Sequence, residues 1–90
     1  MADAFEVEIS PHNMSGPVST AASVQLSAVC PNFLTLEYCW HVPPWRQELI
    51  AGAEHIENGA IPLPTAPGLG IAWDPTAARK RSLASGAIGR

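Results

Sequence analysis

The feature that most constrains the fold is a strand, helix and strand pattern within the first 37 residues. Residues 5–9 alternate apolar and polar side chains, which predicts a strand with two different faces. Residues 18–30 repeat apolar, mostly small side chains at spacings of three and four, which predicts a helix, and residues 33–37 predict a second strand. This order is typical of a βαβ unit, in which the two strands are parallel.

Prolines mark the boundaries of these elements. Ser10-Pro11 ends the first strand, and Ser15-Gly16-Pro17 begins the helix, because a proline at the first helical position gives up an N–H that would have no partner there. Pro31-Asn32 stops the helix before the second strand.

The remainder of the chain has a different composition. An aromatic and proline-rich stretch follows Glu37, and we expect it to cover another surface rather than form a regular element. Further on, the sequence predicts one helical turn at residues 46–50, a two-residue hairpin turn at Asn58-Gly59, an extended segment at residues 61–64 and a short helix at residues 75–83.

Length and composition limit what the chain can be. A chain of 90 residues can form one small domain, whereas a complete (β/α) barrel needs about 250. Hydrophobic residues make up 47% of the chain and charged residues only 14%. We therefore expect anything barrel-like here to be a piece of a barrel that exposes apolar surface when isolated.

The charge balance argues against several classes of partner. The net charge of −3 disfavours nucleic acid, since that affinity depends on clustered Lys and Arg, and we interpret Arg79-Lys80-Arg81 as a solvated helix face or tail. The sequence shows neither a signal peptide nor an apolar run of about 18 residues, so we expect a soluble, cytoplasmic protein without membrane partners. Cys30 and Cys39 with His41 and His55 match no usual zinc spacing, and no metal site is predicted.

The candidate site lies at the ends of the two predicted strands. His12 comes just after the first strand and Glu37 ends the second. Because α/β folds build active sites at the carboxyl edge of parallel strands, these two side chains are candidates for one site. The alternative for Glu37 is a solvated residue at a strand end.

Several stretches together resemble a known family. The chain is similar to the carboxyl-terminal part of the enolase superfamily, in the mandelate racemase/muconate lactonizing enzyme subgroup. It looks most like acid-sugar dehydratases and galactarolactone cycloisomerases. The likeness extends from about Ala4 to Asp74 and is carried by residues 10–37, Trp45, residues 57–62 and residues 67–71.

The resemblance implies an α/β fold that is a fragment of a TIM-like (β/α) barrel. Residues 1–45 would be the last βαβ unit, formed by the seventh strand, its helix and the eighth strand. Residues 46–90 would be a carboxyl-terminal segment that packs on the capping domain of the family.

The resemblance also implies a chemistry. Family members remove the proton next to a carboxylate and hold the resulting enediolate on Mg²⁺. His12 would be the base or acid of the seventh strand, and Glu37 the protonated acid that donates to the substrate carboxylate. Asn13 would contact hydroxyls of a small sugar-acid substrate; its alternative is to cap the turn. Intact family members are usually homo-oligomers.

Much of the family pattern is absent from the chain. The Mg²⁺ ligands, the second-strand lysine and the aspartate that orients the histidine would all lie upstream, and Lys80, in the tail, cannot replace that lysine. Met1 comes almost directly before the seventh strand, as though a longer reading frame began at an internal methionine. We therefore expect a fragment that is inactive alone.

Two alternatives remain open from the sequence. One is a stand-alone βαβ protein that binds a partner or ligand through its aromatic segment, residues 38–45, without catalysis. The other is one half of a split barrel enzyme.

Overall fold

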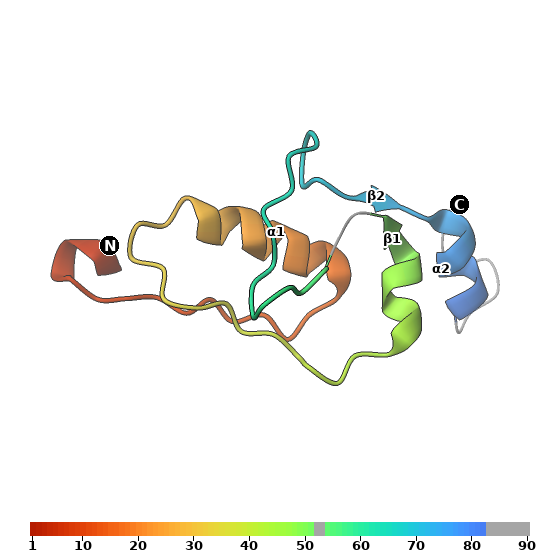
Figure 1. The fold of residues 1–90 in the computed structure, drawn as a ribbon, viewed down its shortest axis with the longest axis horizontal. Helices are drawn as coiled ribbons and strands as arrows, with labels where there is room; N and C mark the ends of the chain where they lie inside the picture. The colour runs from red at the N-terminus through yellow and green to blue at the C-terminus, as the bar shows by residue number, and fades with distance from the viewer. Residues whose placement is uncertain (52–53, 83–90) are drawn as a thin grey trace.

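The structure is a computed structural model that describes residues 1–51 and 54–82. In chain order its elements are a 3-10 helix η1 (Ala2–Phe5), an α-helix α1 (Pro17–Ala28), a 3-10 helix η2 (Pro44–Leu49), the strands β1 (Ile50–Ala51) and β2 (Ala72–Trp73), and a short helix α2 (Pro75–Arg81) (Figure 1). Among the described residues, no helix has the length and apolar character needed to cross a membrane.

Two extended segments lie alongside each other and flank α1 in the sequence. Ile9 pairs with Phe33 in the parallel sense, which confirms the predicted strand direction. The Ile9 N–H donates to the Asn32 carbonyl at 2.9 Å, and the Leu34 N–H donates to the Ile9 carbonyl at 2.9 Å. Further along, the Glu37 N–H donates to the carbonyl of Pro11 at 3.3 Å.

The predicted strand at residues 5–9 is wrong for most of its length. The chain forms η1 up to Phe5, and Glu6 then takes a left-handed conformation with φ 56°, so that only Ile9 is paired. The second predicted strand, residues 33–37, is likewise bridged only at Phe33. A strand needs hydrogen-bonding partners along its length. In the described part of the chain the two segments have only each other as neighbours, and their pairing is interrupted at Pro11.

The predicted start of the long helix is confirmed. Gly16 is the N-cap of α1, and Pro17 occupies its first turn. The helix ends at Ala28 rather than at residue 30, because Pro31 disfavours helical geometry at the preceding residue. Its buried side chains follow one another at spacings of one and three, and apart from Val24 they are small or polar: Pro17, Thr20, Ala21, Val24 and Ser27. This face allows close approach but buries little apolar area.

The second half of the chain folds back toward α1. The strands β1 and β2 pair antiparallel, with Ile50 opposite Trp73, and η2 contacts α1, β1 and α2. Asp74 begins α2 by accepting hydrogen bonds from the backbone N–H groups of Thr76 and Ala77. The helix ends at Arg81, since Ser82 is extended with ψ 133°, so the helix predicted over residues 75–83 is wrong at Ser82. The Arg81 guanidinium lies 5.5 Å from the ring centre of Trp45. The last predicted helical residue, residue 83, lies outside the described residues.

Two other local predictions are confirmed. Residues 46–49 of the predicted turn at 46–50 are helical, within η2, whereas Ile50 is extended and begins β1. Asn58 and Gly59 form a tight turn with φ values of 50° and 75°, and Glu57 and Ala60 pair across it. Positive φ at both central residues is the geometry for which Asn-Gly is favoured.

The core of the described residues is small. The buried hydrophobic residues are Ala21, Val24, Ile50, Ala77 and Ala78. The accessible surface is 6472 Å², whereas a compact 9.5 kDa protein exposes about 5,000 Å². The radius of gyration is 15.1 Å, against about 12 Å for a compact domain of this length.

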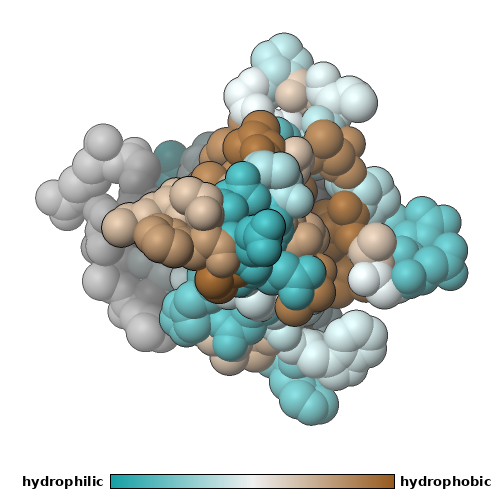
Figure 2. Space-filling model, turned by 90° about the vertical axis from the view of Figure 1, so that its left-hand side faces the viewer, coloured by the Kyte–Doolittle hydropathy of each residue, from teal (hydrophilic) through white to brown (hydrophobic). Residues whose placement is uncertain are grey.

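Large apolar side chains reach the surface, as the composition predicted. Phe5, Val29 and Trp40 are each more than 70% exposed. Hydrophobic surface is mixed with polar surface on the end of the molecule that Figure 2 faces. A cavity of about 380 Å³ also separates α1 from residues 33–36 and 59–63. The chain therefore has apolar surface that its described residues leave uncovered.

Two glycines offer a matched test of packing. Gly70 and Gly59 share a φ of 75°, but a Cβ at Gly70 would overlap the ring of Pro64 whereas a Cβ at Gly59 would meet open space. We expect Gly59→Ala to cost about 1 kcal/mol of unfolding free energy for its backbone strain. Gly70→Ala should cost at least about 1 kcal/mol more because of the overlap. Urea denaturation measures both, and equal losses would contradict the packing of residues 64 and 70.

Candidate active site

The structure brings the two predicted catalytic side chains together. His12 Nε2 lies 3.5 Å from Glu37 Oε2, although the residues are 25 positions apart in the sequence. The side chain of His12 is 82% exposed and that of Glu37 is 42% exposed. A titratable imidazole and a carboxyl group thus stand side by side on a surface that a small molecule can reach.

The carboxyl group of Glu37 is held by the backbone next to His12. The Asn13 N–H donates to Glu37 Oε2 at 2.9 Å, and the Glu37 N–H donates to the Pro11 carbonyl. The two oxygens of this carboxyl group are therefore different. Oε2 is committed as an acceptor, and within residues 1–51 and 54–82 Oε1 has no hydrogen-bond partner, so Oε1 is the atom free to engage a ligand.

Asn13 is buried, whereas the side chain of its neighbour His12 is exposed. Its residue is only 2% exposed, and its side-chain amide lies within hydrogen-bond distance of the Thr20 hydroxyl. The backbone of Asn13 thus serves the site while its side chain is turned into the interior. Its predicted contact with substrate hydroxyls stays a prediction.

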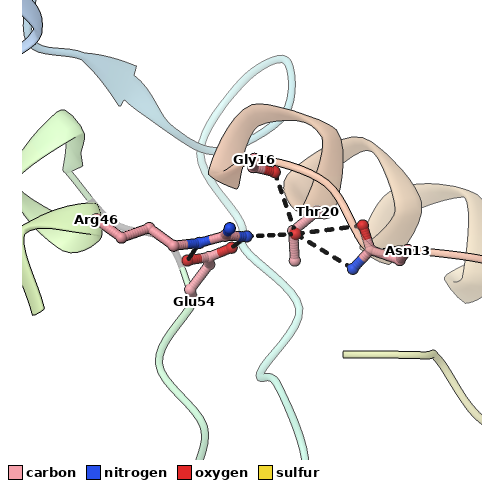
Figure 3. A network of polar contacts seen from close by, with 5 residues as sticks. All are labelled: Asn13, Gly16, Thr20, Arg46 and Glu54. Carbon is pink, nitrogen blue, oxygen red and sulfur yellow. Dashed lines mark hydrogen bonds and ion pairs between the residues drawn. The ribbon is translucent and has the colours of Figure 1, made fainter. Parts of the chain in front are cut away.

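A buried polar network lies behind Asn13 (Figure 3). The Arg46 guanidinium donates to both carboxylate oxygens of Glu54, with Nε 2.7 Å from Oε2, and its Nη2 also donates to Thr20 Oγ1 at 3.0 Å. The side chains of Arg46 and Glu54 are 12% and 2% exposed. The hydrogen bonds that Arg46 donates to Glu54 raise the pKa of Arg46 above its ordinary value, so the guanidinium stays protonated.

This network was not predicted from the sequence. Thr20 lies within the predicted helix but is not one of the apolar positions that predict it, and Arg46 and Glu54 are charged residues of the irregular half. The eight-residue separation of Arg46 and Glu54 fits no helical or strand period. The only available signal was the low number of charged residues, which made each one a candidate for a specific contact.

No cluster that could hold a metal occurs among the described residues: nowhere do three His, Cys, Asp or Glu side chains gather. Cys30 and Cys39 are free thiols. The pair of His12 and Glu37 does not by itself make a hard-cation site, which needs several oxygen ligands. Residues 1–51 and 54–82 therefore do not fit a Mg²⁺ site of their own.

The family of the chain is established by comparison with known proteins. Residues 1–77 match the family model described as enolase C-terminal domain-like. The chain belongs to this enolase C-terminal domain-like family. The match includes both candidate catalytic residues and the Arg46 and Glu54 pair.

Curated relatives include sugar-acid dehydratases. The chain is 38% identical over 74 residues to a D-xylonate dehydratase from Haloferax volcanii and 41% identical over 73 residues to a D-gluconate dehydratase from Thermoproteus tenax. These alignments cover 82% and 80% of the chain. They cover only 18% and 15% of the two relatives, so the chain spans less than a fifth of either enzyme.

Solved structures of the superfamily share the fold of this chain. A mandelate racemase/muconate lactonizing enzyme from Jannaschia sp. CCS1 superposes on 97% of the chain with a TM-score of 0.82 and 36% identity. A mandelate racemase subgroup enolase from Agrobacterium tumefaciens, crystallised with sodium and phosphate, superposes on 89% with a TM-score of 0.77 and 34% identity. Each match covers 22% of the solved chain. The resemblance to this superfamily and the α/β, barrel-fragment fold class are confirmed.

The buried ion pair gives a direct stability test. Glu54→Gln leaves the Arg46 charge buried without its partner and should cost about 3 kcal/mol of unfolding free energy. Glu48→Gln removes the same charge from the exposed pair with Arg81 and should cost less than about 1 kcal/mol. Thermal and urea unfolding compare the two variants. Equal losses would show that Arg46 and Glu54 are not buried together.

Tyr38 gives a test by pH. Burial raises the pKa of the Tyr38 phenol above its ordinary value of 10.0, and the negative charge of Glu54 raises it further. Because the folded pKa is the higher one, the phenol contributes stability that is present below pH 10.0 and is lost as the pH rises through the folded pKa. Tyr38 is the only tyrosine, so ultraviolet titration of phenolate reports it alone. The midpoint should fall when urea unfolds the chain, and an unchanged midpoint would contradict the burial.

Proposed function

We propose that the chain supplies one corner of an enolase-type active site in an enzyme that acts on a sugar acid. The reaction removes the proton next to the carboxylate, as in an acid-sugar dehydratase or a lactone cycloisomerase. The observation that carries the proposal is the 3.5 Å approach of His12 Nε2 to Glu37 Oε2 on neighbouring parallel segments. Family membership and the dehydratase relatives support it.

His12 is proposed as the proton carrier. A histidine can accept and return a proton near neutral pH, and this imidazole is open to a ligand. After it takes the proton from the carbon next to the carboxylate, the resulting imidazolium can protonate a hydroxyl that leaves from the adjacent carbon. Dehydration and isomerisation share this first step and differ only in the later ones.

Glu37 is proposed as the acid that meets the substrate carboxylate. A carboxyl group donates only when it is protonated, and Oε1 is the oxygen available for that proton because Oε2 accepts from the Asn13 N–H. A hydrogen bond from Oε1 would strengthen as negative charge develops on the substrate carboxylate. The backbone N–H of Asn13 would hold Glu37, and contact of the Asn13 side chain with substrate hydroxyls stays a prediction.

Mg²⁺ stabilises the enediolate in enzymes of this superfamily. Its ligands are proposed to come from outside the described residues, together with the lysine of the second strand. In the same proposal, residues 1–45 complete the barrel, residues 46–90 reach the capping domain, and the chain alone is inactive. The intact enzyme would be cytoplasmic and a homo-oligomer.

The proposal predicts the effect of one substitution in the enzyme that contains this chain with the rest of its barrel. His12→Asn should slow exchange of the substrate proton next to the carboxylate by at least about 100-fold, because the proton carrier is lost. Proton NMR in deuterium oxide measures the exchange, and magnesium titration should give unchanged binding. His41→Asn, at another exposed histidine, is the control and should retain full exchange. Full exchange in His12→Asn would remove this residue from the chemistry.

The coding DNA upstream of Met1 tests the context of the chain. A continuous or frameshifted reading frame that encodes a barrel with three acidic metal ligands would support the proposal. An unrelated gene there, with a good ribosome-binding site before Met1, would count against it.

A further inference from the structure

Packing alone does not explain why Arg46 and Glu54 are buried as an ion pair. Removing two charges from water is costly, and an apolar pair of similar size is often as stable. The carboxylate of Glu54 uses both oxygens on Arg46, and the residue has a left-handed backbone with φ 56°, which a glutamate rarely adopts. A costly pair on an unusual backbone indicates that its geometry serves something else.

The hydroxyl of Thr20 accepts a hydrogen bond from the arginine of that pair. Arg46 Nη2 donates to Thr20 Oγ1 at 3.0 Å, and Asn13 Nδ2 donates to the same oxygen at 3.2 Å. A hydroxyl has two acceptor sites and one proton. Once both acceptor sites are filled, the proton has two acceptors within reach, the Gly16 carbonyl at 3.2 Å, in the turn that begins α1, and Asn13 Oδ1 at 3.3 Å. Every hydrogen-bonding position of Thr20 is then used.

This arrangement fixes Asn13 from behind. Thr20 is 1% exposed and Asn13 is 2% exposed, so neither has water to exchange with its partner. With the amide held by Thr20, the backbone N–H of the same residue is directed at Glu37 Oε2, 2.9 Å away. The carboxyl group of Glu37 lies, in turn, beside His12.

We infer that Arg46, Glu54 and Thr20 are positioning residues for the candidate active site. Through the side chain of Asn13 they hold its backbone N–H on Glu37, and this sets which carboxylate oxygen faces His12 and which faces a ligand. The inference rests on the proposed function for the roles of His12 and Glu37. The holding of Glu37 by Asn13 is a property of the chain itself and can be tested without substrate.

NMR of the full 90-residue chain tests this inference. An amide proton that is bonded to a carboxylate changes its chemical shift when the carboxylate takes up a proton. We expect the backbone amide proton of Asn13 to titrate in step with the side-chain carboxyl carbon of Glu37 under acid conditions. In Thr20→Val, which keeps the shape but lacks the hydroxyl, the amplitude of that amide titration should fall to less than about half.

Three further variants separate positioning from general stability. Thr20→Ser keeps the hydroxyl and should restore most of the amplitude. Ser27→Ala removes a buried hydroxyl from the same helix, which among the described residues bonds only the Ser23 carbonyl, and should leave the amplitude unchanged. Arg46→Lys keeps a positive charge for Glu54 but lacks the second N–H that reaches Thr20, so it should reduce the amplitude as Thr20→Val does.

Clear results would overturn the inference. One is a wild-type Asn13 amide proton whose chemical shift does not follow the Glu37 carboxyl carbon. The others are full amplitude in Thr20→Val and a loss of amplitude in Ser27→Ala equal to that in Thr20→Val. If Thr20→Val does not fold, Arg46→Lys decides, and an unchanged amplitude there overturns the inference. The proposed function fails separately, through full proton exchange in His12→Asn, so the two outcomes can be told apart.

Discussion

The hydrogen bond from Arg46, which Glu54 holds in place, to Thr20 connects the two halves of this chain. The described core contains only five buried hydrophobic residues, three of which are alanines, so apolar burial alone ties the halves together weakly. The ion pair adds a directional link, because Arg46 lies in η2, reaches Glu54 in the following loop and contacts Thr20 on α1. Since Thr20 also contacts Asn13, the same link extends to the candidate site. Much of the structure near the site therefore depends on one polar contact.

Local features of the fold could be predicted because they depend on neighbouring residues. Pro17 begins α1 and Asn58-Gly59 turns the chain, since each restricts its own φ. The extent of the strands could not be predicted in the same way. Residues 5–9 have the alternation of a strand, but a strand is completed by partners that come from elsewhere, and the described residues give only Ile9 a partner. The relatives are more than five times as long as the aligned part of the chain, which is where such partners would be found.

The residues of the candidate site also differ in whether the sequence could predict their contacts. His12 and Glu37 could be paired from the sequence because two parallel strands bring their carboxyl ends together. For Asn13 the sequence predicts a side-chain contact with substrate, which stays a prediction. It could not predict that the Asn13 backbone N–H bonds Glu37 while the side chain bonds Thr20, because both contacts depend on the folded chain. Thr20, Arg46 and Glu54 were missed because their contacts span 26 and 8 positions of the chain and follow no period. Contacts of this kind are visible only once the chain is folded.

The single parallel pairing of Ile9 with Phe33 has a consequence for the alignment of the two segments. Side chains in an extended segment alternate between faces, so a slip of one residue would turn Glu37 to the face opposite His12. A single bridge fixes this register only weakly. The carbonyl of Pro11 and the N–H of Asn13 supply two more fixed points, both on Glu37. Glu37, which we propose as the acid of the site, is thus also the residue that keeps the two segments in register.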